Sequence, residues 1–432
     1  MSQKNTAGRR DDLSRREFLQ AAAATTAGLA LLAAGAVRAA QSKPADELRI
    51  AIVGVGAHGR VLVNSCLKTA AVRFKAVCDI WPYNLQYASR LLKKYDQPVN
   101  AYADYQDMLD KEKDLDAVLI ATPDWVHAEQ TIACLKAGKH VYCEKEMATN
   151  AADARKVVLA ARESGRRLQI GRQHRSNSRY HAALDYIDGK KALGRITHVC
   201  GQWHGHKRFD YGWPKGQELD EPALRKYGYD TMERLRNWRW FQKFSAGEIA
   251  NLGSHQIDVF NWFLHARPLA VYAAGGLDYY DKYEWYDNVS AVYEWQYEWE
   301  GKTKTVRGCY RILNTTEVGG FLETFVGDEG TLTISELPDV GGLTREVGSP
   351  EAEWEKNLQP IRERTYPPIP APTPPKPPHT QHLENFFEAI RGKAKLNCPP
   401  EVAFEAAVSV FRANESMKEG KRLTFTPEDF KV

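Results

Sequence analysis

The stretch LRIAIVGVGAHG, residues 48–59, decides how the first part of this chain folds. Its apolar, β-branched run over residues 48–53 predicts a buried strand, and the glycine pattern GxGxxG follows the strand directly. Residues 60–67 then read as the start of a helix. Strand, glycine loop and helix in this order predict a dinucleotide-binding turn, because the free N–H groups at the helix N-terminus bind the pyrophosphate.

The residues of this loop have separate physical tasks. Gly54 permits the tight turn, Gly56 lets the backbone approach the pyrophosphate, and Gly59 lets helix and strand pack closely. Ala57 and His58 complete the predicted cofactor-binding loop.

A second predicted strand, residues 74–78, ends at Asp79, twenty residues beyond Gly59. A carboxylate at this place accepts hydrogen bonds from a ribose diol and repels a 2′-phosphate. Ile80 and Trp81 come next and offer no cation for that phosphate. The sequence therefore predicts NAD in preference to NADP. The alternative is that Asp79 only caps a helix or turn.

Further strands are predicted at 116–121, 140–143 and 167–170, separated by helices at 127–137 and 151–164. This alternation predicts an α/β Rossmann domain, a doubly wound parallel sheet over residues 47–171. Ligands bind at the carboxyl ends of such strands. Thr122, Lys145 and Gln173 fall at those ends.

The pattern changes in residues 172–432, which we assign to a second, α+β domain. Residues 288–299 alternate strictly and predict a half-exposed antiparallel strand, with neighbours at 195–203, 302–313 and 330–334. The aromatic side of that strand forms either a subunit interface or a surface covered by helices of the same domain; its members are Tyr293, Trp295, Tyr297 and Trp299.

Two irregular segments interrupt this domain. Residues 205–240 form an insertion rich in Trp, Tyr and Arg, which suits a sugar or packs on itself; its aromatic residues are Phe209, Tyr211, Trp213, Tyr227, Tyr229, Trp238 and Trp240. Residues 366–378 are rich in proline and predict a stiff, extended connector.

The N-terminal segment is predicted to be an export signal that is not part of the fold. Residues 14–20, SRREFLQ, match a twin-arginine motif, and a weakly apolar run over 21–37 precedes a small-residue cleavage pattern at Ala39. Residues 1–40 therefore predict transport of the folded protein to the periplasm by the twin-arginine translocase. A membrane anchor is the weaker alternative, because the run falls short of about 20 strongly apolar residues.

Composition excludes other classes. A formal net charge of +4 over 432 residues gives no support for nucleic-acid binding. The seven cysteines are scattered without metal-ligand spacing, so no metal site is predicted. Their odd number argues against a complete disulfide framework, and most are expected to be buried.

Four motifs in order resemble the Gfo/Idh/MocA oxidoreductases, which include proteins like glucose-fructose oxidoreductase. They are the glycine loop 54–59, Ala121-Thr122-Pro123 with His127, Glu144-Lys145, and GEIANLGSHQID over residues 247–258. The resemblance covers residues 47–427. It implies an NAD(P)-dependent oxidoreductase acting on a sugar or polyol hydroxyl, with a large, mostly antiparallel open sheet used for homo-oligomer formation. It also implies that Thr122, Pro123, His127 and Glu144 contact the cofactor.

The resemblance suggests how the reaction would proceed. His255 would accept the hydroxyl proton as hydride leaves, and Lys145 would stabilise the developing alkoxide. Glu144 would orient these groups. Two positions depart from the family pattern: Glu146 replaces the proline of its EKP motif, and Asn251 replaces an aspartate that commonly works in proton transfer.

Further candidates lie around these residues. The spacing of Asn251, His255 and Asp258 places all three on one face of a helix, as a wall of the site. Asp258, Arg175 and His204 are expected to contact substrate. Other residues within reach of cofactor or substrate are Arg172, Gln173, His174 and His206.

Three functions remain open on the sequence. The first is a sugar or polyol dehydrogenase with a tightly held cofactor, including a closed cycle that reduces one sugar while it oxidises another. The second is an NAD-dependent glycosidase or lyase that oxidises its substrate transiently, eliminates a leaving group and returns the hydride. The third is a non-catalytic NAD-binding protein, suggested by Asn251 and Glu146.

Overall fold

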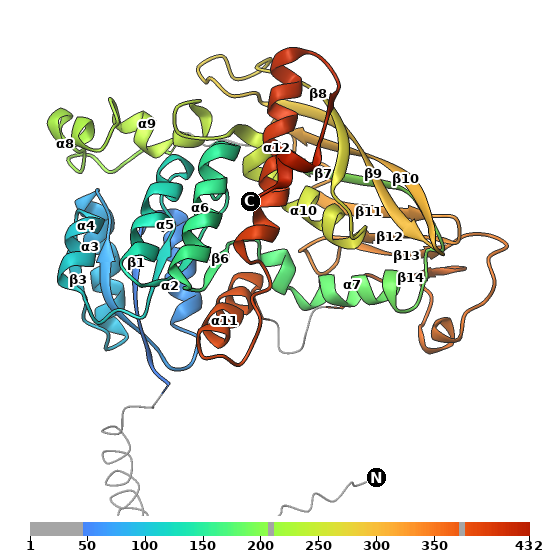
Figure 1. The fold of residues 1–432 in the computed structure, drawn as a ribbon, viewed down its shortest axis with the longest axis horizontal. Coiled ribbons are helices and arrows are strands. Elements are labelled where there is room, and N and C mark those ends of the chain that lie inside the picture. The colour runs from blue at the N-terminus through green and yellow to red at the C-terminus, as the bar shows by residue number, and fades with distance from the viewer. Residues whose placement is uncertain (1–45, 206–210, 371–375) are drawn as a thin grey trace, which may run out of the picture. The chain divides into compact units, whose positions relative to one another are not determined.

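The computed structural model describes residues 46–205, 211–370 and 376–432. The predicted export signal lies outside these ranges, and so do His206 and Phe209. Residues 48–432 form one unit, and its two sheets are seen in Figure 1. No helix in the described ranges has both the length and the apolar composition needed to cross a bilayer.

The first sheet is the predicted Rossmann sheet. Six parallel strands lie in the order β3-β2-β1-β4-β5-β6, with helices between successive strands. Its elements are β1 (Leu48–Val53), α2 (Ala57–Cys66), β2 (Val72–Cys78), α3 (Pro82–Lys94), β3 (Asn100–Tyr102), α4 (Tyr105–Lys111), β4 (Ala117–Ile120), α5 (His127–Lys136), β5 (His140–Cys143), α6 (Ala151–Ser164) and β6 (Leu168–Ile170).

The second sheet has nine strands in the order β14-β13-β12-β11-β7-β10-β9-β8-β15. It is mostly antiparallel, with β7 and β10 as its parallel pair. The strands are β7 (Ile196–His204), β8 (Pro268–Gly276), β9 (Asn288–Trp299), β10 (Lys302–Leu313), β11 (Phe321–Gly327), β12 (Gly330–Ile334), β13 (Gly341–Arg345), β14 (Thr365–Tyr366) and β15 (Leu423–Thr424). Helices α7 (Ser178–Asp188), α10 (Ser254–Phe263) and α12 (Pro400–Glu419) pack against it.

Helices of the same chain cover much of the aromatic side of β9. Tyr293 and Trp295 are fully buried beneath helices of the same chain. The Tyr293 hydroxyl donates to the carbonyl of Ser409 on α12, and Trp295 Nε1 donates to Asn261 on α10. Of the two alternatives for this side of the strand, cover by helices of the same domain holds for Tyr293 and Trp295, whereas Tyr297 and Trp299 are half-buried.

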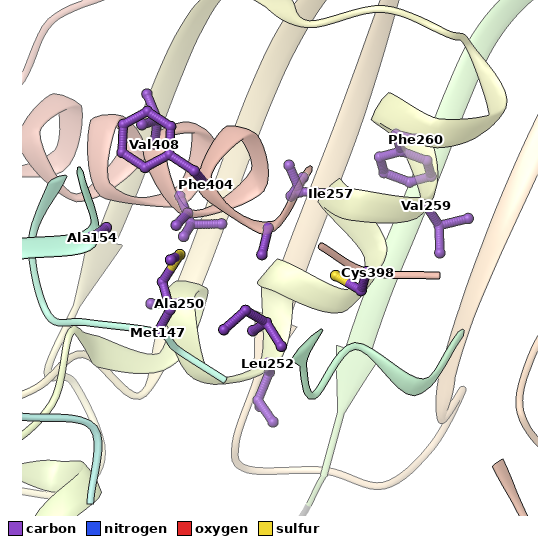
Figure 2. Packing of buried hydrophobic residues seen from close by; sticks show 14 of the residues in the cluster. Met147, Ala154, Ala250, Leu252, Ile257, Val259, Phe260, Cys398, Phe404 and Val408 are labelled. Carbon is purple, nitrogen blue, oxygen red and sulfur yellow. The ribbon is translucent and has the colours of Figure 1, made fainter. Parts of the chain in front are cut away.

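The C-terminal helices join the two sheets. The helix α11 (Pro378–Ile390) buries Leu383, Phe386 and Phe387 in the core beside β1, β2 and α2, so it belongs with the Rossmann half. The helix α12 packs on α6, α10 and β8. Figure 2 shows its Phe404 in one core with Met147 and Leu252, which anchors the loop after β5 and the turn before α10 together.

The aromatic insertion packs partly on itself and partly on the Rossmann half. It contains α8 (Glu221–Lys226) and α9 (Met232–Arg236), which lie above that half in Figure 1. Trp81, after β2, donates from Nε1 to the Gln217 carbonyl at 2.6 Å. Trp125, after β4, donates from Nε1 to the Tyr229 hydroxyl at 3.0 Å. The insertion therefore closes over two loops at the carboxyl ends of the parallel strands.

Candidate active site

A cavity of about 920 Å³ lies at the carboxyl ends of the parallel strands. This volume is at the upper end of the range for small-molecule and cofactor sites. Both halves of the chain line it. The Rossmann half contributes the glycine loop, Asp79, the loop 121–130 and Lys145, and the second half contributes Trp203, the insertion, Asn251, His255 and Glu336.

The glycine loop has the geometry that a dinucleotide requires. Gly54 has φ +88°, and a Cβ there would lie 2.7 Å from the backbone of Thr122. A Cβ on Gly59 would collide with the Gly54 carbonyl oxygen, whereas one on Gly56 would meet only Asn84, at 3.9 Å. The helix α2 starts at Ala57 without a side-chain cap, so its first N–H groups stay available for an anion.

Asp79 is held in place by three donors. Its carboxylate accepts hydrogen bonds from the N–H groups of Val55 and Trp81, both at 2.9 Å, and from Asn84 Nδ2 at 3.1 Å. Burial raises its pKa, and these bonds and Arg60 oppose that effect. Remaining lone pairs of the carboxylate are free to accept a ribose diol.

Two arginines near Asp79 escaped the sequence analysis. Arg60 donates from Nη2 to Asn84 Oδ1 at 3.0 Å, and Asn84 in turn donates to Asp79. Arg236, from the insertion, stacks on Trp81 with its guanidinium carbon 5.0 Å from the ring centre. The prediction considered a cation that could bind the 2′-phosphate only directly after Asp79. It therefore missed Arg60, which lies on a helix, and Arg236, which comes from the second half of the chain.

The other predicted cofactor residues hold the loops together. Both ring nitrogens of His127 face carbonyls, Nδ1 that of Glu146 at 2.6 Å and Nε2 that of Thr122 at 2.7 Å. Glu144 pairs with His58 Nε2 at 3.0 Å. Burial alone would raise the pKa of Glu144, but His58, His379 and Lys145 lower it to about 2. Pro123 lines the same cavity.

Lys145 and Asn251 meet across the two halves. The ammonium group of Lys145 donates to the Asn251 carbonyl and lies 3.4 Å from its Oδ1. Asn251 Nδ2 donates to Glu248 Oε1 at 3.2 Å, and Glu248 Oε2 accepts from Asn314 at 3.1 Å. Burial lowers the pKa of Lys145. A buried carboxylate therefore lies one hydrogen bond beyond Asn251.

His255 also lines the cavity, next to His174. The two ring centres are 5.0 Å apart, and His255 Nδ1 is buried with no hydrogen-bond partner among the described residues. Burial, together with Lys145 and His174, lowers its pKa well below the usual value, so the ring is a neutral proton acceptor at pH 7.

Two acidic residues that the sequence analysis missed lie beside these groups. Glu336 pairs with His174 Nε2 at 3.0 Å. Burial opposes charge on His174, but Glu336 raises its pKa above the usual value. Asp124 is 3% exposed, and its Oδ2 has no hydrogen-bond partner in the described ranges. Burial raises the pKa of Asp124, against the attraction of Arg239 and Lys145.

Several predicted contacts lie elsewhere. Asp258 does not share a wall with Asn251 and His255, because it follows His255 by three residues in α10 and is therefore turned roughly 60° around the helix axis. Asp258 is 1% exposed and binds Arg175 through two hydrogen bonds, at 2.7 and 2.9 Å. Neither residue lines the cavity, so the expected substrate contacts through this pair are wrong.

His204 and Arg172 are also occupied outside the cavity. His204 Nδ1 faces the Val318 carbonyl at 2.7 Å, and its Nε2 accepts from Arg311 at 3.1 Å; the cavity is lined by Trp203 instead. The expected substrate contact of His204 is therefore wrong. Arg172 forms a buried ion pair with Glu146 and donates to the Ser254 carbonyl at 2.8 Å. Glu146, which stands at the family's proline position, thus connects the first half of the chain to α10 through Arg172.

Fold and site define a two-domain dinucleotide-binding protein with an acid–base cluster between its halves. Comparison identifies the family: residues 48–172 match the oxidoreductase family with an NAD-binding Rossmann fold, and residues 181–320 match the GFO/IDH/MocA C-terminal domain. The chain belongs to the Gfo/Idh/MocA oxidoreductases.

Curated relatives match about a third of this chain. Inositol 2-dehydrogenase of Salmonella typhimurium is 36% identical over 160 residues, which are 36% of this chain and 45% of the relative. The match thus covers less than half of that relative's length.

Solved structures share the whole fold. The WlbA dehydrogenase of Chromobacterium violaceum, solved with NADH and UDP-GlcNAcA, is 22% identical with a TM-score of 0.65, covering 88% of this chain and 97% of its own. The aldose-aldose oxidoreductase of Caulobacter crescentus, solved with glycerol, is 20% identical with a TM-score of 0.66, covering 88% and 100%.

Proposed function

We propose that this protein is an NAD-dependent oxidoreductase that acts on a hydroxyl group of a sugar or polyol. The observation that carries the proposal is the meeting of Lys145, Asn251 and a neutral His255 in the cavity that the glycine loop also lines. The inositol, aldose and sugar-nucleotide names of the relatives support this substrate class.

Each residue of the site has a separate role in the proposed reaction. Bound NAD supplies the acceptor for the hydrogen that leaves the substrate carbon. The imidazole of His255 takes the hydroxyl proton, because the ring is neutral and lines the cavity. The Lys145 ammonium donates to the same oxygen and stabilises its developing negative charge. Asn251 orients Lys145 and is itself oriented by Glu248.

We further propose that the cofactor is NAD and that the protein holds it tightly. The Asp79 carboxylate favours a free ribose diol, although Arg60 and Arg236 lie near enough to soften the discrimination against NADP. The aromatic insertion closes over Trp81 and Trp125, at two sides of the cavity, which supports slow release. A retained cofactor requires a reaction cycle that regenerates it in place.

Release of the cofactor from the native protein tests this proposal. The purified chain is denatured, and the supernatant is assayed enzymatically for NAD(H) and NADP(H). We expect NAD(H) in near-stoichiometric amount. Absence of both dinucleotides, together with no binding when either is added to the native protein, would exclude the proposed cofactor site.

The cavity also supports a second function, an NAD-dependent glycosidase or lyase. Oxidation of one hydroxyl needs one base. The structure holds further titratable groups nearby: the ion pair between His174 and Glu336, and the buried Asp124, whose pKa is raised. Elimination needs such further groups, one to remove a C–H proton and one to protonate the leaving oxygen.

A panel of aryl glycosides and free sugars separates the candidates. Release of the aryl group without net NADH supports the glycosidase, and NADH formed from free sugar with added NAD supports the dehydrogenase. Failure of every substrate to react would favour a non-catalytic NAD-binding protein.

We also propose twin-arginine export and assembly of several copies through the open side of the second sheet. The motif at residues 14–20 carries the first proposal. Replacing Arg15 and Arg16 by Lys should retain the precursor in the cytoplasm, and unchanged periplasmic recovery would contradict the export proposal.

Light scattering of the purified protein tests the proposed assembly of several copies.

A further inference from the structure

Three metal-binding side chains meet on the open side of the nine-stranded sheet. His198 and Cys200 lie two residues apart on β7, so both point to the same side. The parallel pairing of β7 with β10 sets Cys309 opposite Cys200. His198 Nε2 is 3.8 Å from the Cys309 sulfur, and the three donor atoms all lie within 4.8 Å of one another.

The strands that carry these residues are rigid. Both β7 and β10 are interior strands, paired on each side. On the opposite side of the sheet, a Cβ on Gly201 would meet Phe260 of α10, and the Tyr310 hydroxyl donates to Gln256 of α10 at 3.0 Å. Donors on such strands keep their spacing without a ligand, which is what a metal site requires.

The surroundings suit sulfur ligands. Val292 is the neighbour of Cys309 on β9, and Thr324 is the neighbour of Cys200 on β11, so neither cysteine is paired directly with a carboxylate on these strands. Arg307 and Arg311 flank Cys309 on the same side of β10. The other five cysteines are buried and unpaired, so they do not compete.

We propose that His198, Cys200 and Cys309 bind one thiophilic metal ion of the zinc class when the two cysteines are reduced. Two thiolates and one imidazole are a known zinc ligand set that leaves a fourth position open. The donor set selects soft or borderline cations over Mg²⁺ or Ca²⁺.

The disulfide that joins Cys200 and Cys309 closes this site. A small thiol opens it by exchange: the disulfide and two molecules of thiol give two cysteine thiols and one oxidised thiol dimer. Binding of a divalent ion then releases two protons, one from each cysteine. The Cα atoms are 4.9 Å apart, so side-chain rotation alone can separate the sulfurs around an ion.

Cobalt binding to the full-length protein tests the proposal. One sample is reduced and desalted without chelator, another is left oxidised, and both are titrated with Co²⁺ and followed by thiolate charge-transfer and d–d absorption. We expect one equivalent of Co²⁺, displaced by Zn²⁺, in the reduced sample only. Cys200→Ser should weaken binding and reduce the thiolate band, because only Cys309 remains to supply a thiolate. His198→Ala removes a ligand and should weaken binding at least as much as loss of a residue behind a ligand does, roughly 10-fold or more.

His265→Ala, which removes an exposed histidine outside the sheet, is the matched control and should bind as the wild type does. Circular dichroism checks that each variant is folded. Absence of binding by the reduced wild type would overturn the proposal, and so would equal binding by a folded Cys200→Ser variant. The site lies on the other side of the sheet from the helices, so either result leaves the proposed oxidoreductase unaffected.

Discussion

Replacing Asn251 by Asp would restore the family's aspartate, and we expect it to harm this protein. The amide nitrogen of Asn251 donates to Glu248 at 3.2 Å, and its oxygen lies 3.4 Å from the Lys145 ammonium. Glu248 is 2% exposed and Asn251 is 7% exposed. Asn251→Asp would therefore place two carboxylates in contact inside the protein.

The magnitude follows from these distances. With an effective dielectric constant of about 20, repulsion between the carboxylates would be about 5 kcal/mol, and attraction to Lys145 would be about the same. These two effects nearly cancel. The variant still loses the hydrogen bond to a charged acceptor, ~1.5–3 kcal/mol, and buries another charge. We expect the free energy of unfolding to fall by roughly 3 kcal/mol at pH 7.

The loss should depend on pH in a defined direction. Because attraction to Lys145 offsets repulsion from Glu248, burial remains, and it raises the pKa of the new aspartate in the folded state above its unfolded value. The folded variant then holds a proton that the unfolded chain has released, so its stability decreases as pH rises through the raised pKa. Relative to wild type, Asn251→Asp should be more stable at pH 5 than at pH 7.

The companion variant Glu248→Gln/Asn251→Asp exchanges the amide and the carboxylate. It keeps the hydrogen bond and puts the charge beside Lys145, so it should regain most of the lost stability, with a coupling energy of ~2–3 kcal/mol. Urea unfolding at both pH values measures the stabilities, and kcat/KM on the substrate found in the panel measures function. If Asn251→Asp alone proved as stable and as active as wild type, this reasoning would be refuted.

Further predictions concern the same cavity. Lys145→Ala should lower the rate ~10²–10³-fold and His255→Ala ~10²–10⁴-fold, with NAD content and melting temperature retained; full activity in both would place the active site elsewhere. Asp79→Ala should weaken NAD binding and reduce the preference for NAD over NADP, as measured by isothermal titration. Equal affinity of the wild type for NAD and NADP would contradict the role of the carboxylate. Because the pKa of His255 is depressed, the acidic limb of kcat/KM should lie well below pH 6.5; a limb at or above that value would exclude His255 as the base.

The sequence predicted those parts of the fold that repeat locally. The strands at 48–53, 140–143, 288–299 and 302–313 occur with the predicted bounds, because each carries a continuous or strictly alternating apolar pattern. Lys145 could be placed in the site because it follows a parallel strand, whose carboxyl end faces the ligand in any such sheet.

Other parts of the site depend on contacts between distant segments. Arg236 and Arg239 reach the cavity from an insertion whose path no local pattern reveals, and Glu336 reaches it from the loop after β12. The helical spacing of Asn251, His255 and Asp258 brought the first two to the cavity but not Asp258, whose carboxylate pairs with Arg175. A helical spacing cannot show this pairing, because Arg175 lies 83 residues away in the sequence.

The two departures from the family pattern have one structural consequence in common. Glu146 pairs with Arg172, which also holds the Ser254 carbonyl, and Asn251 lies between Lys145 and Glu248. Each departure brings a buried carboxylate into a network that joins the loop after β5 to the segment 248–254. A family aspartate at 251 would need no such partner, because it could pair with Lys145 itself. In this chain Asn251 meets Lys145 through an amide instead of a carboxylate, and the carboxylate that acts most strongly on the charge of Lys145 is Asp124.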